Sequence, residues 1–365
     1  MLIYLCLSSH GFGHAARQAT VLSALHQLQP SWRLVVSSLV SADFLKLACG
    51  SAVPIEHRPV GWDVGMIQAD ALGVDQEKTL RSLKALDRSL PQRLDQETAW
   101  ITNQKTPVLV VGDIPPSAAV LAERLGAPLV WMGNFGWDDI YAPLGGPFAT
   151  YAAAAKAQYQ KGQLLLRCPF SLAMDWGLKE HEIGVTISAL RELPSQLQLH
   201  LEQIQKPLVL VGFGGLGVAI NPALFRLWPN HHFLMPEPVA PQLRASFQSE
   251  INVTLLPERV RPFDVMPYCD RHLGKPGYST FCEALSQGLG MHVVERDGFA
   301  EASVLMDGLR RYGNHRILSR DSFAQGEWGL EQPLVQAIHP MASKHGAEEA
   351  AEALAMVALS TVQHG

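Results

Sequence analysis

The chain opens with the feature that most constrains its fold, a short apolar run followed by a glycine-containing turn and a helical pattern. The run LIYLCL at residues 2–7 is typical of a buried parallel strand. The turn SSHGFGH follows, and apolar residues then recur at helical spacing as far as Leu28. Strand, turn and helix together form the first unit of a doubly wound α/β domain. Since ligands bind beyond the carboxyl ends of the strands in such sheets, this turn is a candidate site.

The same alternation of strands and helices continues along the chain and predicts an α/β fold of two doubly wound, Rossmann-like domains with a cleft between them. A chain of 365 residues is longer than one hydrophobic core usually supports, which also favours two domains. We place an N-terminal domain at residues 1–185 and a second domain at residues 186–340. Residues 341–365 are expected to form a helix that packs back on the first domain.

Two further features of the first half bear on its organisation. A long polar helix is expected over residues 76–103, and Pro91 inside it predicts a kink or a break into two helices. Residues 175–194 carry no clear periodicity and are expected to be the linker between the domains.

Composition narrows the class of protein. The net charge of −5 argues against a nucleic-acid partner held by bulk electrostatics. The five cysteines are scattered, without a C-x-x-C pair, which favours free thiols in a reducing compartment over a disulfide framework or a zinc site. No apolar run approaches the roughly 18 residues of a membrane span. We therefore expect a cytoplasmic protein, with peripheral contact with a membrane left open.

Two titratable residues are expected to meet at one edge of the first sheet. His14 lies in the turn after the first strand, and Asp113 ends another predicted strand of the same sheet. A carboxylate at that place can orient an imidazole as a general base. His10 in the same turn is a competing base or a substrate contact. The plainer alternatives are that His14 bonds only to nearby backbone and that Asp113 is a turn residue before two prolines.

Glycine turns and one helix start in the second half are candidates for binding phosphate. The turn over residues 212–217 includes Gly214 and Gly215, whose backbone N–H groups can face phosphate oxygens, although the same pattern also suits a simple tight turn. The second candidate is GKPGYSTFCE at residues 274–283, where a strand end leads into a helix. Its candidate ligand-binding residues are Lys275, Gly277, Ser279, Thr280 and Glu283.

The roles of these residues follow from the chemistry of a nucleoside diphosphate. The helix N-terminus and its hydroxyls suit an anion, and Glu283 can accept hydrogen bonds from ribose hydroxyls. Glu301 follows a later strand and suits sugar hydroxyls. The alternative for all of them is an ordinary capped helix and a solvated loop.

A group on the other side of the expected cleft suits an acceptor. The segment at residues 133–141 follows a strand of the first domain and contains Asn134, Trp137 and Asp138. Aromatic rings and carboxylates together suit a sugar or another polyhydroxyl, although they also suit packing at a domain edge.

At this point the sequence resembles a family. The paired domains, the Gly13-His14 turn, the strand end at Asp113 and the helix from Lys275-Pro276-Gly277 to Glu283 resemble a GT-B glycosyltransferase. The segments HGFGHAAR, VGDIPPSAAVLAERLGAPLVWMGNFGWDDIY and KPGYSTFCEAL resemble the glycosyltransferase-like region of plant L-arabinokinases. The second half is similar to the enzyme that adds N-acetylglucosamine to lipid-linked muramyl peptide, and Thr280 and Glu283 match its T-x-x-E pattern. The likeness to the glycosyltransferase-like region of plant L-arabinokinases is greater and covers most of the chain.

The resemblance implies that the second domain binds a nucleotide sugar and that the first domain binds an acceptor. It also implies that His14 deprotonates an acceptor hydroxyl, that Asp113 holds His14, and that Thr280 and Glu283 face the donor diphosphate and ribose. The sequence has no D-x-D motif, which is consistent with transfer that needs neither metal nor cofactor. Two other functions stay open, a nucleotide-sugar 2-epimerase and a catalytically silent module that binds a nucleotide sugar.

Overall fold

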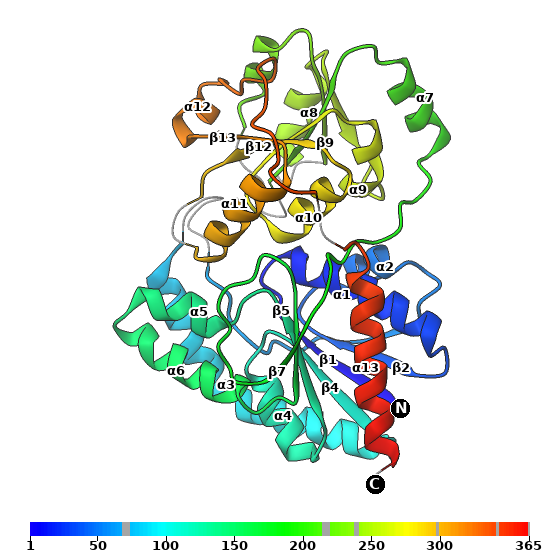
Figure 1. Cartoon of the computed structure of the whole chain (residues 1–365), viewed down its shortest axis with the longest axis vertical. Coiled ribbons are helices and arrows are strands. Elements are labelled where there is room, and N and C mark those ends of the chain that lie inside the picture. Colours follow the sequence, from blue (N-terminus) through cyan, green and yellow to red (C-terminus); the bar gives the residue numbers. More distant parts are fainter. Residues whose placement is uncertain (68–73, 214–219, 237–240, 297–298, 341–342, 364–365) are drawn as a thin grey trace.

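The chain folds into two α/β units, each built around a parallel sheet (Figure 1). The computed structural model describes residues 1–67, 74–213, 220–236, 241–296, 299–340 and 343–363. The first sheet has seven strands in the order β3-β2-β1-β4-β5-β6-β7, and the second has six in the order β10-β9-β8-β11-β12-β13. All of these pairings are parallel. The predicted fold class of two doubly wound, Rossmann-like domains is confirmed.

The first sheet and its helices account for the chain up to β7. Its strands are β1 (Leu2–Leu7), β2 (Arg33–Ser37), β3 (Ile55–Arg58), β4 (Val108–Asp113), β5 (Leu129–Gly133), β6 (Leu164–Arg167) and β7 (Lys179–Glu182). Its helices are α1 (Phe12–Leu28), α2 (Ala42–Cys49), α3 (Gln76–Asn103), α4 (Ser117–Leu125), α5 (Trp137–Tyr141) and α6 (Pro147–Tyr159).

The second sheet follows the same plan. Its strands are β8 (Leu208–Gly212), β9 (His232–Pro236), β10 (Val253–Leu256), β11 (Arg271–Gly274), β12 (Gly290–Val294) and β13 (His315–Leu318). The α-helices of this half are α7 (Ser195–Gln203), α8 (Pro241–Gln248), α9 (Pro262–Val265), α10 (Tyr278–Ser286), α11 (Glu301–Tyr312) and α12 (Arg320–Ala324). Short 3-10 turns are η1 (Ala142–Leu144), η2 (Pro222–Leu227) and η3 (Met266–Tyr268).

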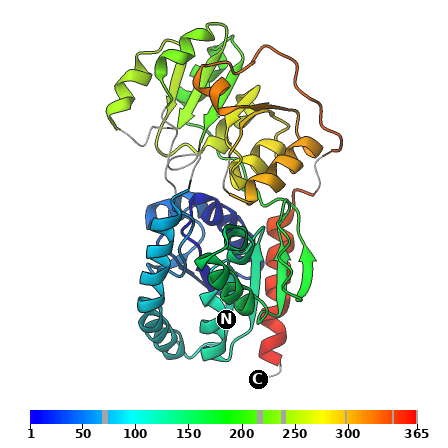
Figure 2. The same cartoon turned by 90° about the vertical axis from the view of Figure 1, so that its left-hand side faces the viewer.

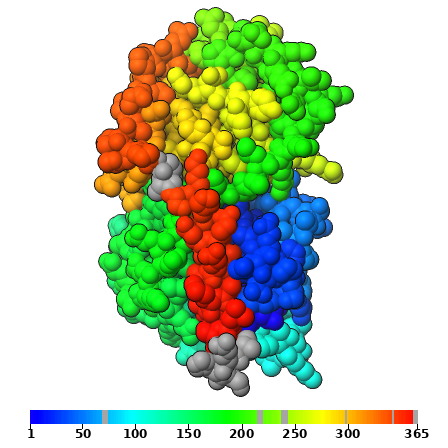
Figure 3. All heavy atoms as spheres, turned by 45° about the vertical axis from the view of Figure 1, so that its right-hand side comes forward, coloured from blue at the N-terminus to red at the C-terminus, as the bar shows by residue number. Residues whose placement is uncertain are grey.

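Helix α13 (Gly346–Gln363) follows the second sheet but packs against α1 of the first unit. Figures 1 and 2 show both ends of the chain in this first unit, and Figure 3 shows α13 lying on its surface beside the N-terminal segment. Its buried residues Ala350 and Leu354 join the same hydrophobic cluster as Leu5 of β1. The chain therefore returns to the unit in which it starts.

Both faces of β1 are buried, and each face packs into a different core. Ile3, Leu5 and Leu7 belong to one cluster, whereas Leu2, Tyr4 and Cys6 belong to another. This division follows from the alternation of side chains along a strand, since successive residues point to opposite faces of the sheet. A strand that is apolar at every position has to be covered on both sides, so β1 lies in the middle of the sheet.

Two expectations about the first half need correction. Of the two alternatives at Pro91, the break is excluded, because α3 continues through this residue as one helix. The segment that was expected to be a linker contains β7, which pairs with β6 at the edge of the first sheet. All four residues of β7 are exposed, so this strand has no apolar face in its sequence.

Candidate active site

His14 and Asp113 meet at the carboxyl edge of the first sheet, as their positions after two strands predict. Strands β1 and β4 are neighbours, and Leu7 at the end of one pairs with Asp113 at the end of the other. Gly11 turns the chain between β1 and α1 with φ 82°, a conformation that favours glycine. His14 then lies in the first turn of α1, and its Nδ1 is 2.8 Å from Oδ1 of Asp113. Both side chains are buried.

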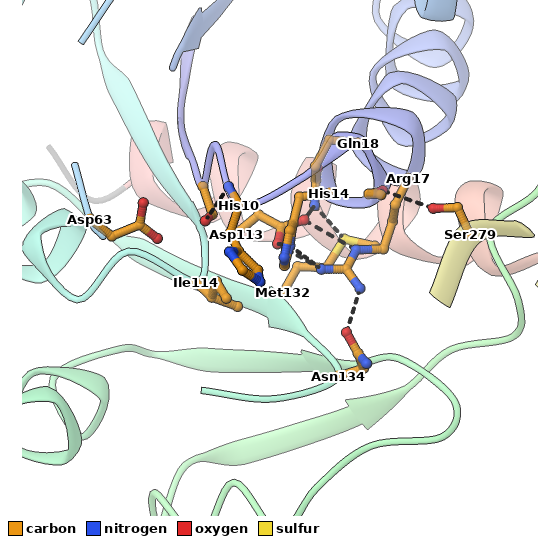
Figure 4. Close-up of polar contacts among 12 residues, drawn as sticks. His10, His14, Arg17, Gln18, Asp63, Asp113, Ile114, Met132, Asn134 and Ser279 are labelled. Atoms are coloured by element: carbon orange, nitrogen blue, oxygen red, sulfur yellow. Dashed lines mark hydrogen bonds and ion pairs between the residues drawn. The ribbon is translucent and has the colours of Figure 1, made fainter. Parts of the chain in front are cut away.

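Asp113 is also held by two residues one turn further along α1 (Figure 4). Arg17 donates from Nη2 to Oδ1 at 2.6 Å and from Nε to Oδ2 at 3.1 Å, and Gln18 donates to Oδ2 at 2.7 Å. Burial alone would raise the pKa of Asp113, but the charges and hydrogen bonds of Arg17 and His14 hold it at about 2. The carboxylate is therefore ionised throughout the ordinary pH range.

This geometry sets what His14 can do. When Nδ1 carries the proton, it donates to Asp113 and the lone pair of Nε2 is left to accept a proton from a substrate. Nη2 of Arg17 lies 3.1 Å from the same Nδ1, so the dyad sits beside a permanent positive charge. The ring of Phe135 packs edge-on against the imidazole, with centroids 5.6 Å apart. A buried and oriented imidazole of this kind is suited to general base catalysis.

His10 lies in an aromatic setting next to the dyad. Its ring contacts Trp137 of α5 and Phe299 of the second unit, at centroid distances of 5.4 and 5.6 Å. Burial and nearby positive charges, including His14, lower the pKa of His10 to about 3, so this imidazole is neutral near pH 7. Gly65 allows the close approach of its loop, because a Cβ there would overlap the His10 ring.

Of the other residues predicted on the acceptor side, Asn134 bonds to the network around the dyad, whereas Trp137 and Asp138 bond to other side chains. Asn134 accepts from Nη1 of Arg17 at 2.9 Å and so belongs to the network around the dyad. Trp137 donates from Nε1 to Asp63 at 2.8 Å, and burial raises the pKa of Asp63. Asp138 accepts from Nε1 of Trp176 at 3.0 Å, and no hydrogen bond joins it to the dyad in the described part of the chain. Its pKa is raised to about 6 by burial and by the charge of Asp139.

The second unit contacts the dyad network at three points. Oγ of Ser279, in the first turn of α10, donates to the carbonyl of Gly13 at 3.0 Å. The ring of Tyr278 lies under the guanidinium of Arg17, 5.0 Å from its centroid. Nδ2 of Asn134 donates to Oε1 of Glu301, the first residue of α11, at 2.7 Å. Ser279 and Glu301, both predicted on the donor side, therefore bond to the first unit in this structure.

The remaining residues predicted to bind the donor line the start and first turns of α10. Gly277 precedes the helix, and a Cβ added there would meet open space. Thr280 and Glu283 follow on the helix, both partly buried. Burial raises the pKa of Glu283 to about 8, and the nearby charges are those of Arg261 and Asp264. Gly214 and Gly215 lie outside the described residues.

A cavity of about 580 Å³ adjoins this charge cluster. Asp264 lines it together with the residues that follow β10. Lys275 lies before α10, and burial together with the charge of Arg296 lowers its pKa to about 8. Glu283 therefore interacts with the charge of Asp264 in the wall of this cavity, and the charges of Lys275 and Arg296 act on one another.

Several site residues were missed from the sequence, namely Arg17, Gln18, Asp63 and Phe299. Arg17 had a usable signal, because it follows His14 by three residues on one helix and so shares a face with it. Gln18 follows His14 by four residues and shares the same face, whereas Asp63 and Phe299 depend on contacts between distant segments. Among the described residues, no group of three or more His, Cys, Asp or Glu side chains is placed to hold a metal ion. In the same part of the chain, no helix has the length and apolar character of a membrane span.

Comparison with known proteins gives one curated relative and many solved structures of similar fold. The chain is 27% identical over 334 residues to an L-arabinokinase of Arabidopsis thaliana, covering 88% of this chain and 31% of the relative. The chain thus spans about a third of the length of that relative. No family model matches.

The solved structures are similar over nearly the whole chain. The UGT2 of Phytolacca americana, complexed with UDP-2fluoro-glucose and pterostilbene, has a TM-score of 0.63 at 13% identity and covers 98% of this chain and 94% of its own. The UGT71G1 of Medicago truncatula, complexed with UDP-glucose, has a TM-score of 0.62 at 13% identity and covers 99% and 94%. These similarities show that the chain has the GT-B fold of UDP-glycosyltransferases, which confirms the predicted resemblance.

Proposed function

We propose that this GT-B chain is a glycosyltransferase that moves a sugar from a nucleotide-diphosphate donor to an acceptor hydroxyl, with His14 as the general base. The observation that carries the proposal is the placement of the His14–Asp113 pair at the edge of the first sheet, directly against the first turn of α10 in the second. An acceptor held by the first unit and a donor held by the second then meet at this boundary.

On the donor side, the N-terminus of α10 and Lys275 would bind the diphosphate. The unpaired N–H groups of the first helical turn and the positive end of the helix dipole attract an anion. Glu283 lies one turn further on and would accept hydrogen bonds from the ribose hydroxyls, with the base in the neighbouring cavity. The same positive groups would stabilise the leaving diphosphate, so the proposed reaction needs neither a metal ion nor a cofactor.

On the acceptor side, Nε2 of His14 would take the proton of the attacking hydroxyl while Nδ1 stays bonded to Asp113. The ionised Asp113 stabilises the imidazolium that forms. His10, Asn134, Trp137 and Asp138 would shape the acceptor region. The UDP-sugar ligands of the solved structures make UDP-sugars the first donors to test. Because all five cysteines are free, we place the protein in the cytoplasm.

The proposal is tested by measuring binding and turnover with nucleotide sugars. We expect UDP and at least one UDP-sugar to bind the purified protein in isothermal titration calorimetry. Above pH 8, where Glu283 is ionised, Glu283→Gln is expected to weaken binding about 10-fold or more, because a charged acceptor of two ribose hydroxyls is lost. Glu202→Gln on the exposed face of α7 is the matched control and should bind like the wild type.

Turnover distinguishes the three functions. UDP release that requires an alcohol or phenol acceptor supports transfer. Epimerised UDP-sugar formed without an acceptor would indicate a 2-epimerase, and binding without either product would indicate a silent module. Absence of binding by any nucleoside diphosphate or nucleotide sugar would reject the proposal.

The pH dependence of binding should separate the contributions of Glu283 and Lys275. The pKa of Glu283 is raised to about 8, so below that pH uridine must displace a proton before its hydroxyls can donate to the carboxylate. We expect uridine affinity to rise with pH up to about 8 and then to level off. The pKa of Lys275 is lowered to about 8, so above that pH the charge that attracts a diphosphate is lost. UDP affinity should therefore pass through a maximum near this pH.

Calorimetry between pH 6.5 and 9.5 with uridine and UDP measures both effects (this range brackets the two pKa values of about 8). In Glu283→Gln, the rise with uridine should disappear. In Lys275→Met, the fall with UDP at high pH should disappear. A uridine profile that is flat in the wild type would contradict the role of Glu283.

A further inference from the structure

Two positively charged side chains, Lys275 and Arg296, lie at the edge of the second sheet. Lys275 follows the end of β11, and Arg296 follows the end of β12, the neighbouring parallel strand. The carboxylate that acts on both is Glu301, and its Oε1 already accepts from Asn134. Among the described residues, Lys275 and Arg296 therefore share one nearby carboxylate, and that carboxylate is already hydrogen-bonded.

The guanidinium of Arg296 has buried nitrogen atoms that lack hydrogen-bond partners in the described part of the chain. Its Nε and Nη2 are buried, yet neither has a hydrogen-bond partner among the residues that the structure describes. One face of the guanidinium lies 4.6 Å from the ring centroid of Phe299, which fixes its orientation. Burial lowers the pKa of Arg296, and Glu301 opposes that effect. A partly buried guanidinium without a hydrogen-bonded anion is costly, so a ligand that supplies the anion is the natural explanation.

The position of Arg296 distinguishes it from the groups that face the diphosphate and ribose. Glu283 interacts with the charges of Arg261 and Asp264, whereas Lys275 interacts with Arg296 and Glu301. Through Phe299, Arg296 adjoins the first unit, because that ring contacts both His10 and Phe135. Phe135 in turn packs on His14. Arg296 thus lies toward the dyad, on the side where the transferred sugar has to be.

We propose that Arg296 forms an anion subsite for a carboxylate on the transferred sugar, so that the donor is a nucleotide-linked acidic sugar. This inference rests on the proposed function. Lys275, three residues before the start of α10, serves the diphosphate, while Arg296, further along the chain, serves the sugar. A planar guanidinium matches a carboxylate with two parallel hydrogen bonds, which a neutral sugar cannot accept with equal strength. His10, neutral beside it, is available as a further hydrogen-bonding group.

The test compares the affinities of three probes, UDP, UDP-glucose and UDP-glucuronate, by calorimetry. The wild type is expected to bind UDP-glucuronate more tightly than UDP-glucose. Arg296→Met keeps an apolar chain against Phe299. It should lower the affinity for UDP-glucuronate about 10- to 100-fold and leave the affinities for UDP and UDP-glucose close to their wild-type values. Arg310→Met is the matched control, because Arg310 is an exposed arginine of α11 paired with Asp307, and it should change none of the three.

Each other result rejects the inference in a recognisable way. An equal loss for all three probes would mean that Arg296 binds the diphosphate, and no loss would mean that it binds no anion of the donor. If the wild type binds UDP and binds UDP-glucose more tightly than UDP-glucuronate, the inference of an acidic-sugar subsite is wrong while the proposed function stands. If none of the three binds, the donor site fails as well.

The melting temperature of Arg296→Met is a second test, because a binding role and a structural role of Arg296 predict different results. Because Nε and Nη2 of Arg296 have no hydrogen-bond partner among the described residues, replacing this arginine by methionine should leave the melting temperature unchanged or raise it. An arginine that holds the fold together would instead lower the melting temperature when it is lost. A marked fall in the melting temperature of Arg296→Met would therefore contradict the subsite.

Discussion

His14→Ala is expected to lower the rate of sugar transfer by about 100- to 10,000-fold, since this is the range that a positioned general base contributes. The affinity for UDP should change little, because His14 lies on the first unit and the proposed diphosphate site is on α10 of the second. The measurement is the release of UDP from a UDP-sugar with a panel of alcohol and phenol acceptors. His26→Ala in the last turn of the same helix is the matched control and should retain the wild-type rate.

The choice of acceptor sharpens this test. An alkyl alcohol needs the base to attack, whereas an acidic phenol is partly ionised already and needs it less. The loss in His14→Ala should therefore be largest with alkyl alcohols and smaller with acidic phenols. A uniform loss with all acceptors would indicate that the histidine acts by positioning and not by proton transfer. A full rate with alcohols would remove His14 from the mechanism.

The contact between His14 and Asp113 was open to prediction because it depends on topology alone. An apolar strand covered on both faces has to be central, and the ends of neighbouring parallel strands meet at one edge of a sheet. Leu7 and Asp113 are register partners for this reason. The location of α10 near the same edge follows from the plan of two facing sheets, and the contact of Ser279 with Gly13 shows how near it is.

Other parts of the molecule left no signal in the sequence. Strand β7 reads KEHE and is exposed throughout, so its pairing with β6 at the sheet edge has no apolar periodicity to reveal it. Pro91 marks the usual end of a helix, but α3 continues through it, and this residue is exposed. In both cases tertiary structure overrides a local preference.

The network behind the dyad joins segments that local patterns do not connect. Asn134 and Glu301 are 167 residues apart in the chain, and their bond depends on how the two units meet. The same holds for Phe299 against His10. Such contacts need the relative placement of two domains, which neither periodicity nor motif spacing contains. Arg17 is the exception, since its spacing from His14 on α1 places both on one face.

Arg17→Met and Asp113→Leu are each expected to destabilise the fold by about 3–5 kcal/mol, because each leaves a buried partner charge uncompensated. Asp113 is fully buried and Arg17 is 2% exposed, so water cannot replace the missing partner. The melting temperature should fall by roughly 10 °C in each single variant. Arg33→Met, which breaks the exposed pair of Arg33 with Glu56, is the matched control and should cost no more than about 1 kcal/mol.

The double variant Arg17→Met with Asp113→Leu distinguishes a coupled pair from two independent contributions. Replacing both charges by apolar side chains leaves neither charge unpaired, so the double variant should be more stable than either single variant, although inactive. The pKa of Asp113 also predicts a pH dependence. Because it is lowered to about 2 in the folded state, its stabilisation is complete above the unfolded value of about 4 and is lost as pH falls toward 2. Denaturant unfolding of the four proteins between pH 7 and pH 2 measures both effects, and a double variant whose loss equals the sum of the single losses would contradict the coupling.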